Sequence, residues 1–391
     1  MLMAMKGVNT FSVWAGQISL LCGKAVSKQS VFDRLTKHTV IFARQLLEQK
    51  LNEWYERPVA NTLFNTFNNV FLQDSTTLSL PDELAKAFPG NYSKGKYKAV
   101  ARIQAIYNFT QNTFAHFGLT SFCDNDQGAS GLMLNYIGKG DLVIRDLGYF
   151  VLDIFEKIKA KQAHFLTRKH YRVNVYDSNT GKEINLCKLL RKKKYIDTEV
   201  HLGRDHKMKV RLVAMPLAGA IAAERRRKAK QDRDKRLNHS KEYYELLGYA
   251  IYLTTVQQAI WSKEDIARAY GLRWRIEIIF KSWKSHFNIQ RLIHRQCNNK
   301  IRIESMIYMM LIFIALFQTV WYIYFEKRIY HKYNKHVSLL KLAKFISNNI
   351  EMILIQSFEL FELEKYIVKQ CTYDTRKDRI NSVEKYYSYN S

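Results

Sequence analysis

Proline and paired cysteines are the scarcest features of this 391-residue sequence. Four prolines and 16 glycines are too few for a collagen-like or a proline-rich disordered chain. The five cysteines form no CxxC motif and are odd in number, which argues against a structural zinc site and indicates reduced thiols in a cytosolic chain. The first residues lack a basic start followed by an apolar run and a cleavage site, so we expect no signal peptide.

Acidic residues are also scarce relative to basic ones. The sequence has 35 Asp and Glu against 62 Lys and Arg, a formal net charge of +27. Such an excess suits a polyanionic partner, either nucleic acid or an anionic membrane surface, and composition alone does not separate the two.

A single uncharged segment raises the membrane alternative. Residues 306–325, "MIYMMLIFIALFQTVWYIYF", are about long enough to cross a bilayer. Gln318, Thr319 and the scattered aromatic residues weaken that interpretation, and the buried helix of a soluble core has the same pattern. We therefore expect a core helix and no membrane association.

The rest of the chain alternates between helical and strand-like patterns. Residues 1–60 read as helices, with Ser27 or Ser30 placed to cap one of them, and form either a DNA-binding helix pair or a plain packing unit. Three strands follow, in "NNVFLQDSTTLSL", "YKAVARIQAIYNF" and "TFAHFGLTS". A short buried strand at 142–144 and another at 246–256 come later, with strand-like runs between 165 and 217.

A strongly basic segment lies between these strands. Residues 222–241, "AAERRRKAKQDRDKRLNHSK", include the consecutive arginines Arg225, Arg226 and Arg227. The segment is either a solvated helix face or an arm that contacts phosphates. Because the whole chain is basic, we favour phosphate contact.

One carboxylate, Glu277, lies among four cations in "YGLRWRIEIIFKSWK", residues 270–284. The segment is predicted to be helical and to be briefly loosened at Gly271. When residues 270–284 are placed on an ideal helix, Glu277 shares one edge with Tyr270, Arg273 and Lys284. A separate face of that helix is apolar and is formed by Leu272, Ile276, Ile279, Trp283 and Phe287. A carboxylate on the polar edge suits a hard divalent cation, and the neighbouring cations suit phosphates.

Two aspartates are the predicted partners of Glu277. Asp74 and Asp146 each follow a short apolar strand, and each is expected to precede a turn. Two aspartates and a glutamate can share two Mg²⁺ ions, which activate a water or a DNA 3′ hydroxyl and stabilise the leaving oxygen; Mn²⁺ can substitute, and zinc is disfavoured by the oxygen ligands. The other acids considered are expected to be solvated, and they are Asp82, Asp124, Asp126, Asp141 and Asp153.

These residues resemble a known family. Tyr270, Arg273, Glu277 and Lys284 fit the pattern Y-x2-R-x3-E-x6-K, which resembles the signature of one branch of the DDE transposases of bacterial insertion sequences. "FLQDSTTLSLP" is similar to that family's first-Asp segment and "LVIRDLGYF" to its second. The resemblance covers residues 20–330 approximately.

The resemblance implies an α/β fold. Its core is ribonuclease H-like, a mixed sheet flanked by helices, with a β-rich insertion and helical N- and C-terminal regions. The implied regions are 1–60, helical and binding DNA ends; 61–165, the first part of the core; 166–240, the insertion with the basic arm; 241–300, the second part of the core; and 301–391, helical and dimerising.

The resemblance also assigns residues and partners. Asp74, Asp146 and Glu277 are the implied metal ligands, whereas Arg273, Tyr270 and Lys284 are the implied contacts to the transposon end. Trp261 is either a base-stacking residue or a helix-packing one. The implied partners are double-stranded DNA, both inverted repeats and target, and a second copy of the chain; the implied location is the bacterial cytoplasm and nucleoid.

Two interpretations of function therefore stand after the sequence. The first is a cut-and-paste transposase with Mg²⁺-dependent strand cleavage and strand transfer. The second keeps DNA binding without chemistry, as a silent relic or a repressor of a related element. The presence of all three acids favours the first.

Overall fold

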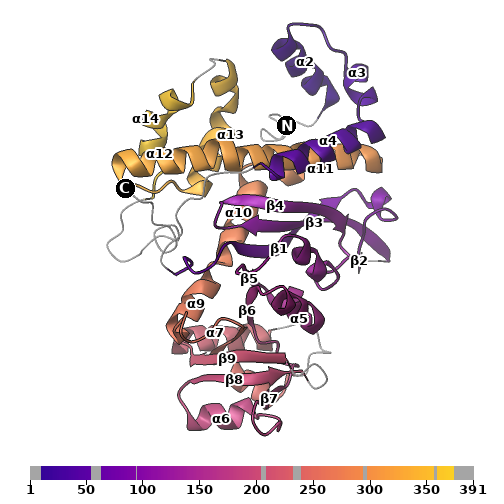
Figure 1. Ribbon diagram of the computed structural model, residues 1–391. Coiled ribbons are helices and arrows are strands. Elements are labelled where there is room, and N and C mark those ends of the chain that lie inside the picture. Colours follow the sequence, from indigo (N-terminus) through magenta and orange to yellow (C-terminus); the bar gives the residue numbers. More distant parts are fainter. Residues whose placement is uncertain are drawn as a thin grey trace. The chain divides into compact units, whose positions relative to one another are not determined.

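A computed structural model describes residues 10–53, 63–93, 95–203, 208–231, 239–293, 297–355 and 359–373. The chain divides into two compact units (Figure 1). Unit 1 comprises Met1–Thr62, Gln73–Asn125 and Trp274–Ser391, and unit 2 comprises Leu63–Leu72 and Asp126–Arg273. Strand β1 (Val70–Leu80) contributes its first residues to unit 2 and the remainder to unit 1.

Unit 1 contains a set of paired strands. β3 (Lys96–Asn108) lies between β2 (Pro89–Ser93) and β1, and β4 (Thr113–Ser121) also pairs with β3. β3 pairs with β2 and with β4 in the antiparallel direction. The three strands predicted from 68 onward are confirmed. β2 was not predicted, because its "PGNYS" sequence begins with proline and has no apolar alternation.

Helices make up the remainder of unit 1. α4 packs on β4 and on α11, and α10 packs on α13. Ser27, rather than Ser30, caps α3, because its side chain accepts a hydrogen bond from the Ser30 amide. The helices are α2 (Phe11–Cys22), α3 (Lys28–Asp33), α4 (Lys37–Leu51), α10 (Trp274–Ser285), α11 (Lys300–Leu316), α12 (Tyr324–Tyr333), α13 (Leu339–Ile355) and α14 (Leu360–Gln370).

The uncharged segment 306–325 lies in a long helix that runs from Lys300 to Tyr333. Length and composition would allow this helix to cross a membrane, but 72% of its most apolar window is buried inside the protein. A π-helical stretch, η5 (Phe317–Ile323), interrupts it between α11 and α12. There Gln318 donates to the Asn112 carbonyl at 3.0 Å, and the Tyr322 hydroxyl accepts from Arg275 on α10 at 2.8 Å. The burial favours the core-helix interpretation.

Unit 2 contains a mixed sheet. From the start of β1, the strand order is β5, β6, β10, β9, β8, β7, with β5 and β6 parallel and the other pairs from β6 onward antiparallel. The strands are β5 (Leu142–Arg145), β6 (His164–Arg168), β7 (Val175–Asp177), β8 (Ile196–Leu202), β9 (Met208–Pro216) and β10 (Tyr249–Thr254).

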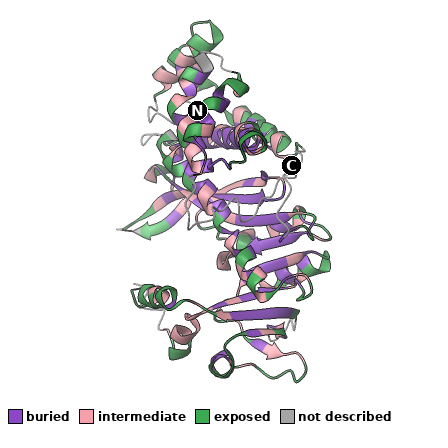
Figure 2. Ribbon diagram, turned by 90° about the vertical axis from the view of Figure 1, so that its left-hand side faces the viewer, coloured by how far each residue is buried: buried purple, intermediate pink, exposed green. Residues whose placement is uncertain are grey.

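Helices flank this sheet. α5 (Leu152–Ala160) and α9 (Lys263–Gly271) both pack against β6 (Figure 1). α6 (Leu186–Lys192), α7 (Gly219–Lys230) and α8 (Lys241–Leu246) belong to the segment that carries β7 to β9 and the approach to β10. The strands are largely buried, whereas the helices carry exposed faces (Figure 2). The predicted fold class, a mixed sheet flanked by helices as in a ribonuclease H-like core, is confirmed.

Candidate active site

Asp146 lies where the chain leaves the sheet of unit 2. β5 ends at Arg145 after four buried residues, and Asp146 then precedes a short 3₁₀ helix, η3 (Leu147–Tyr149). Its backbone carbonyl accepts from the Tyr149 amide at 3.1 Å. The side chain is 36% exposed and is therefore accessible to a ligand. The sequence prediction of an aspartate at the end of a buried strand is confirmed here.

A tyrosine and two arginines surround the Asp146 carboxylate. Its Oδ1 atom is 3.4 Å from the Tyr270 hydroxyl, which donates to it, and 3.6 Å from Arg273 Nε. Arg168 Nη2 is 4.0 Å from the same oxygen. Burial raises the pKa of Tyr270, and the neighbouring Arg168 opposes that shift. The neutral Tyr270 hydroxyl is therefore a hydrogen-bond donor beside a carboxylate in a positive environment.

The loosening of the helix predicted at Gly271 is a complete break in the structure. α9 ends at Gly271, and α10 begins at Trp274. Between them, the Leu272 and Arg273 amides donate three residues back, to Ala269 and Tyr270, so the α-helical register is lost. Positions calculated from one ideal helix therefore do not carry over from Tyr270 to Glu277.

Tyr270 and Arg273 are buried, although the sequence placed them on the polar edge of the helix. Each is only 7% exposed, and both belong to unit 2. The Tyr270 hydroxyl donates to Asp146, and the Tyr270 ring packs against the ring of Tyr252. Arg273 Nε lies 3.6 Å from the Asp146 carboxylate, which is within ion-pair distance but beyond hydrogen-bond distance.

Glu277 and Lys284 belong to α10 in unit 1. The apolar face of this helix is confirmed, because Leu272 just before the helix, Ile276, Ile279, Trp283 and Phe287 just after it are all 2% exposed or less. Trp283 packs against the rings of Phe114 and Phe117 on β4. Glu277 is half-buried and Lys284 is exposed, so α10 holds them at the margin of its buried face.

The sequence placed Asp74 at the end of a strand, and this prediction is wrong. β1 continues through it to Leu80, and Asp74 occupies the middle of that strand with a half-buried side chain. The alternation after Asp74 explains the difference, since Thr76, Leu78 and Leu80 are buried while the residues between them are not. The Ser75 amide donates to Asp74 Oδ1 at 2.8 Å and fixes the carboxylate locally.

The chemistry of the three acids fits a hard divalent cation, because carboxylate oxygens are the ligands that Mg²⁺ and Mn²⁺ prefer. Asp74 and Glu277 belong to unit 1 and Asp146 to unit 2. Within the described part of the chain, no group of three or more His, Cys, Asp or Glu side chains is close enough together to hold a metal ion. A shared metal site formed by the three acids therefore stays a prediction.

The three consecutive arginines lie on α7, and each contacts another group of the protein. Arg225 is half-buried and donates to the Tyr249 carbonyl at 3.3 Å, and Arg226 donates to the Tyr244 carbonyl at 3.0 Å. Arg227 forms a two-pronged pair with Glu224, at 2.8 Å for both contacts. The first part of the basic segment is thus an ordered helix, residues 232–238 lie outside the described residues, and its contact with phosphates stays a prediction.

Trp261 is a packing residue and not an exposed stacking platform. It is 2% exposed, its Nε1 atom donates to the Leu63 carbonyl at 2.8 Å, and its ring meets those of Phe64 and Phe67. Arg168, by contrast, was missed by the sequence analysis although it contacts Asp146. The signal for it was a cation at the end of a buried strand, "FLTR".

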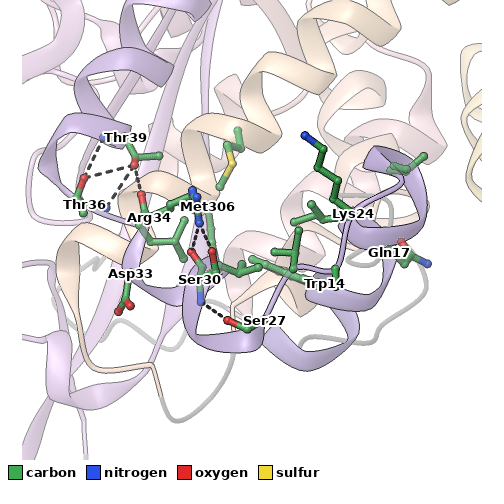
Figure 3. A pocket seen from close by; sticks show the side chains of 17 residues that line it. Trp14, Gln17, Lys24, Ser27, Ser30, Asp33, Arg34, Thr36, Thr39 and Met306 are labelled. Atoms are coloured by element: carbon green, nitrogen blue, oxygen red, sulfur yellow. Dashed lines mark hydrogen bonds between the residues drawn. The ribbon is translucent and has the colours of Figure 1, made fainter.

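Unit 1 contains a large pocket. It has a volume of about 1260 Å³ and lies between α2, α3, α4 and α11 of unit 1 (Figure 3). Apolar side chains such as Trp14, Leu21 and Met306 line much of it. None of the predicted site residues contributes to its wall.

Comparisons with known proteins agree with the resemblance. The family described as Transposase DDE domain matches residues 65–316. The chain is 26% identical over 367 residues to the transposase for insertion sequence element IS231F of Bacillus thuringiensis subsp. israelensis, which covers 88% of this chain and 75% of that protein. It is also 26% identical over 379 residues to the transposase for insertion sequence element IS1151 of Clostridium perfringens, and this match covers 90% of this chain and 78% of that protein.

A solved structure shows a remote likeness. The cryo-EM structure of the piggyBac transposase synaptic complex with hairpin DNA matches with a TM-score of 0.41 and 10% identity, and the match covers 81% of this chain and 61% of that one. The family match is the stronger finding, because residues 65–316 are more than half of the 391 residues. The chain therefore belongs to the Transposase DDE domain family of bacterial insertion-sequence transposases.

Proposed function

We propose that this transposase binds the ends of its insertion sequence and catalyses Mg²⁺-dependent DNA strand cleavage and strand transfer. Asp74, Asp146 and Glu277 are the proposed metal-binding catalytic residues. The observation that supports this most is the surroundings of Asp146, an accessible carboxylate at the end of a buried strand, with Tyr270 and Arg273 in contact with it. When bound, Mg²⁺ would supply activation of a water or 3′ hydroxyl and stabilisation of the leaving oxygen.

The cations of the chain have the complementary role in this proposal. Arg273 holds a phosphate of the strand that is not transferred, because its guanidinium presents several donors in a fixed plane. Tyr270 and Lys284 contact the transposon end near the cut, and Arg225, Arg226 and Arg227 contact the DNA backbone. The net charge of +27 supplies the general attraction to DNA.

The proposal includes assembly and location. Two copies of the chain bridge two transposon ends, so that dimer formation and DNA binding are coupled. The target is a second DNA duplex, and the reaction takes place in the bacterial cytoplasm on nucleoid DNA.

A Glu277→Gln variant tests the proposed chemistry. The purified protein with Mg²⁺ and DNA carrying both ends should nick and join that DNA, and the variant should lose this activity by about a thousandfold or more while its gel-shift affinity for the ends is unchanged. Glu264→Gln is the matched control, since that glutamate is exposed at the start of α9, and it should cleave at the unaltered rate.

Two results would count against the proposal. Cleavage by Glu277→Gln at the unaltered rate would remove the assigned role of Glu277. Tight binding to the ends with no cleavage by the unaltered protein, in Mg²⁺ or in Mn²⁺, would instead support the repressor interpretation.

A further inference from the structure

Arg168 ends a central strand of the unit 2 sheet. It is the last residue of β6 and pairs with Tyr252 on β10. Its neighbour in sequence, Thr167, pairs with Arg145, the residue directly before Asp146. Because β5 and β6 are parallel, Asp146 and Arg168 leave the sheet at the same edge. The side chain of Arg168 is 33% exposed, so the guanidinium reaches solvent from a rigid base.

The guanidinium of Arg168 contacts two of the predicted site residues at once. Its Nε donates to the Tyr270 hydroxyl at 3.2 Å, and its Cζ lies 5.5 Å from the centre of the Tyr270 ring. Its Nη2 is 4.0 Å from Asp146 Oδ1. The contact with Tyr270 is a normal hydrogen bond, whereas the contact with Asp146 is at the limit of an ion pair and is easily exchanged.

Positive charge exceeds negative charge around these residues. Arg273 shares the Asp146 oxygen, and Arg225 on α7 is near enough for Arg168 to act on it: burial, and then the charge of Arg168, lower the pKa of Arg225. Three guanidinium groups therefore accompany the single carboxylate of Asp146 in this part of unit 2. A cluster with such an excess is suited to an anion, and planar guanidinium groups match the two free oxygens of a phosphodiester.

We propose that Arg168 is a further DNA-binding residue of this site, and that it exchanges its contact with Asp146 for a DNA phosphate when the transposon end binds. The inference rests on the proposed function. Tyr270 keeps the guanidinium in place during the exchange, because the Nε–hydroxyl hydrogen bond does not involve Asp146. A phosphate then takes the Nη groups, and the Asp146 carboxylate loses one of its two arginine contacts.

The exchange links DNA binding to metal binding. In the DNA-free protein, Arg168 competes for the Asp146 carboxylate, which would help to hold a divalent cation. Once a phosphate has neutralised Arg168, that competition falls. DNA therefore raises the affinity for a divalent cation, and by linkage the cation raises the affinity for DNA by the same factor.

Mn²⁺ binding measured by electron paramagnetic resonance tests the exchange without relying on catalysis. Free Mn²⁺ is titrated with the full-length protein, alone and with pre-cleaved end duplexes that carry 3′-dideoxy termini. The unaltered protein should bind Mn²⁺ several-fold more tightly with DNA present. Arg168→Ala should bind Mn²⁺ about threefold more tightly than the unaltered protein when DNA is absent, because an exposed ion pair of this kind contributes little more than that.

The same variant should also bind DNA more weakly. Loss of one phosphate contact should lower the affinity for end duplexes about tenfold and reduce the slope of log affinity against log salt by about 0.9. Arg191→Ala is the matched control, because it removes an exposed guanidinium of unit 2 whose partner is Glu245. It should leave the Mn²⁺ affinity unchanged in both conditions. Arg168→Gln keeps the Cβ–Cδ stem and a polar end without the charge, and it replaces the alanine variant if that one does not fold.

The outcomes separate this inference from the proposed function. If Arg168→Ala or Arg168→Gln binds Mn²⁺ in the absence of DNA as the unaltered protein does, the exchange is wrong, even if DNA affinity falls. If the unaltered protein cleaves transposon ends in that case, the proposed function still stands. If Glu277→Gln cleaves normally but the Arg168 variants show the expected change in Mn²⁺ binding, the assigned catalytic glutamate is wrong and the exchange stands.

Discussion

The two halves of the segment 270–284 differ in how they are held. Tyr270 and Arg273 are buried in unit 2, where a hydroxyl and a guanidinium meet the Asp146 carboxylate. Glu277 and Lys284 lie on α10 of unit 1, at the edge of an apolar face that is almost completely buried. The first half is therefore positioned by charges and the second by packing, so substitutions in the two halves should have different consequences.

Removing the packing of α10 should have the largest effect. Trp283→Ala should lower the free energy of unfolding by about 3–5 kcal/mol, because the indole is 1% exposed and contacts three phenylalanine rings. Denaturant unfolding followed by circular dichroism measures the change. Trp274→Ala is the control, because Trp274 is exposed. If Trp274→Ala lowered the free energy of unfolding as much as Trp283→Ala, the buried packing of α10 would not be the cause of the effect.

A buried charge in unit 2 should give a smaller, pH-dependent effect. Burial lowers the pKa of Lys169, the residue after Arg168, to about 8. Below pH 8 the lysine is charged in both the folded and the unfolded chain, so the full cost of burying the charge is present. Between pH 8 and 10.5 the unfolded chain binds more protons, so the free energy of unfolding should rise with pH.

Lys169→Met isolates that contribution. The substitution should stabilise the protein by roughly 2–3 kcal/mol at pH 7, and the gain should shrink as the pH approaches 10. Urea unfolding at a series of pH values measures it, with the exposed Lys182→Met as control. A gain that is the same at pH 7 and pH 10 would show that packing, and not charge, causes the change.

The hydrogen bond between α10 and the π-helical stretch should have an intermediate effect. Tyr322→Phe removes the acceptor of the 2.8 Å hydrogen bond from Arg275, within a completely buried region, at a cost of about 1–2 kcal/mol. Tyr324→Phe, two residues further along, should change stability by less than about 0.5 kcal/mol. If the two substitutions lowered the thermal midpoint equally, the hydrogen bond between Arg275 and Tyr322 would not be the cause of the loss of stability.

Lys284 should affect DNA binding and not stability. Lys284→Ala removes an exposed cation at the end of α10, so unfolding should be unchanged. If Lys284 contacts a phosphate, the slope of log affinity against log salt for end duplexes should fall by about 0.9. An unchanged slope would remove Lys284 from the DNA contacts.

The sequence predicted those parts of the fold whose cause is local. The strand before Asp146 and the apolar face of α10 follow from short patterns of buried residues, and both are confirmed. Asp74 was misplaced because a polar residue within a strand resembles a strand end, although the alternation from Thr76 to Leu80 indicated that β1 continues.

Other features depend on contacts between distant segments and could not be predicted from local patterns. Gly271 indicated a loosening of the helix, but not the complete break at Leu272 and Arg273. Tyr270 is buried in contact with Tyr252 and with Asp146, and Asp146 lies 124 residues earlier. Arg168 gains its position from the parallel pairing of β5 and β6, which places two strand ends together. Local periodicity contains no information about such pairings.

The π-helical stretch η5 determines where the long helix from Lys300 to Tyr333 could lose one residue. A wide turn contains more residues than a regular α-helical turn, so deletion of a partly exposed residue such as Val320 would shorten the stretch towards ordinary α-helix. Deletion within α11 would instead rotate every later side chain by about 100° and turn the buried Phe325 and Ile329 towards water. Among the regular and wide turns of this helix, η5 is thus where a one-residue change in length would be best tolerated.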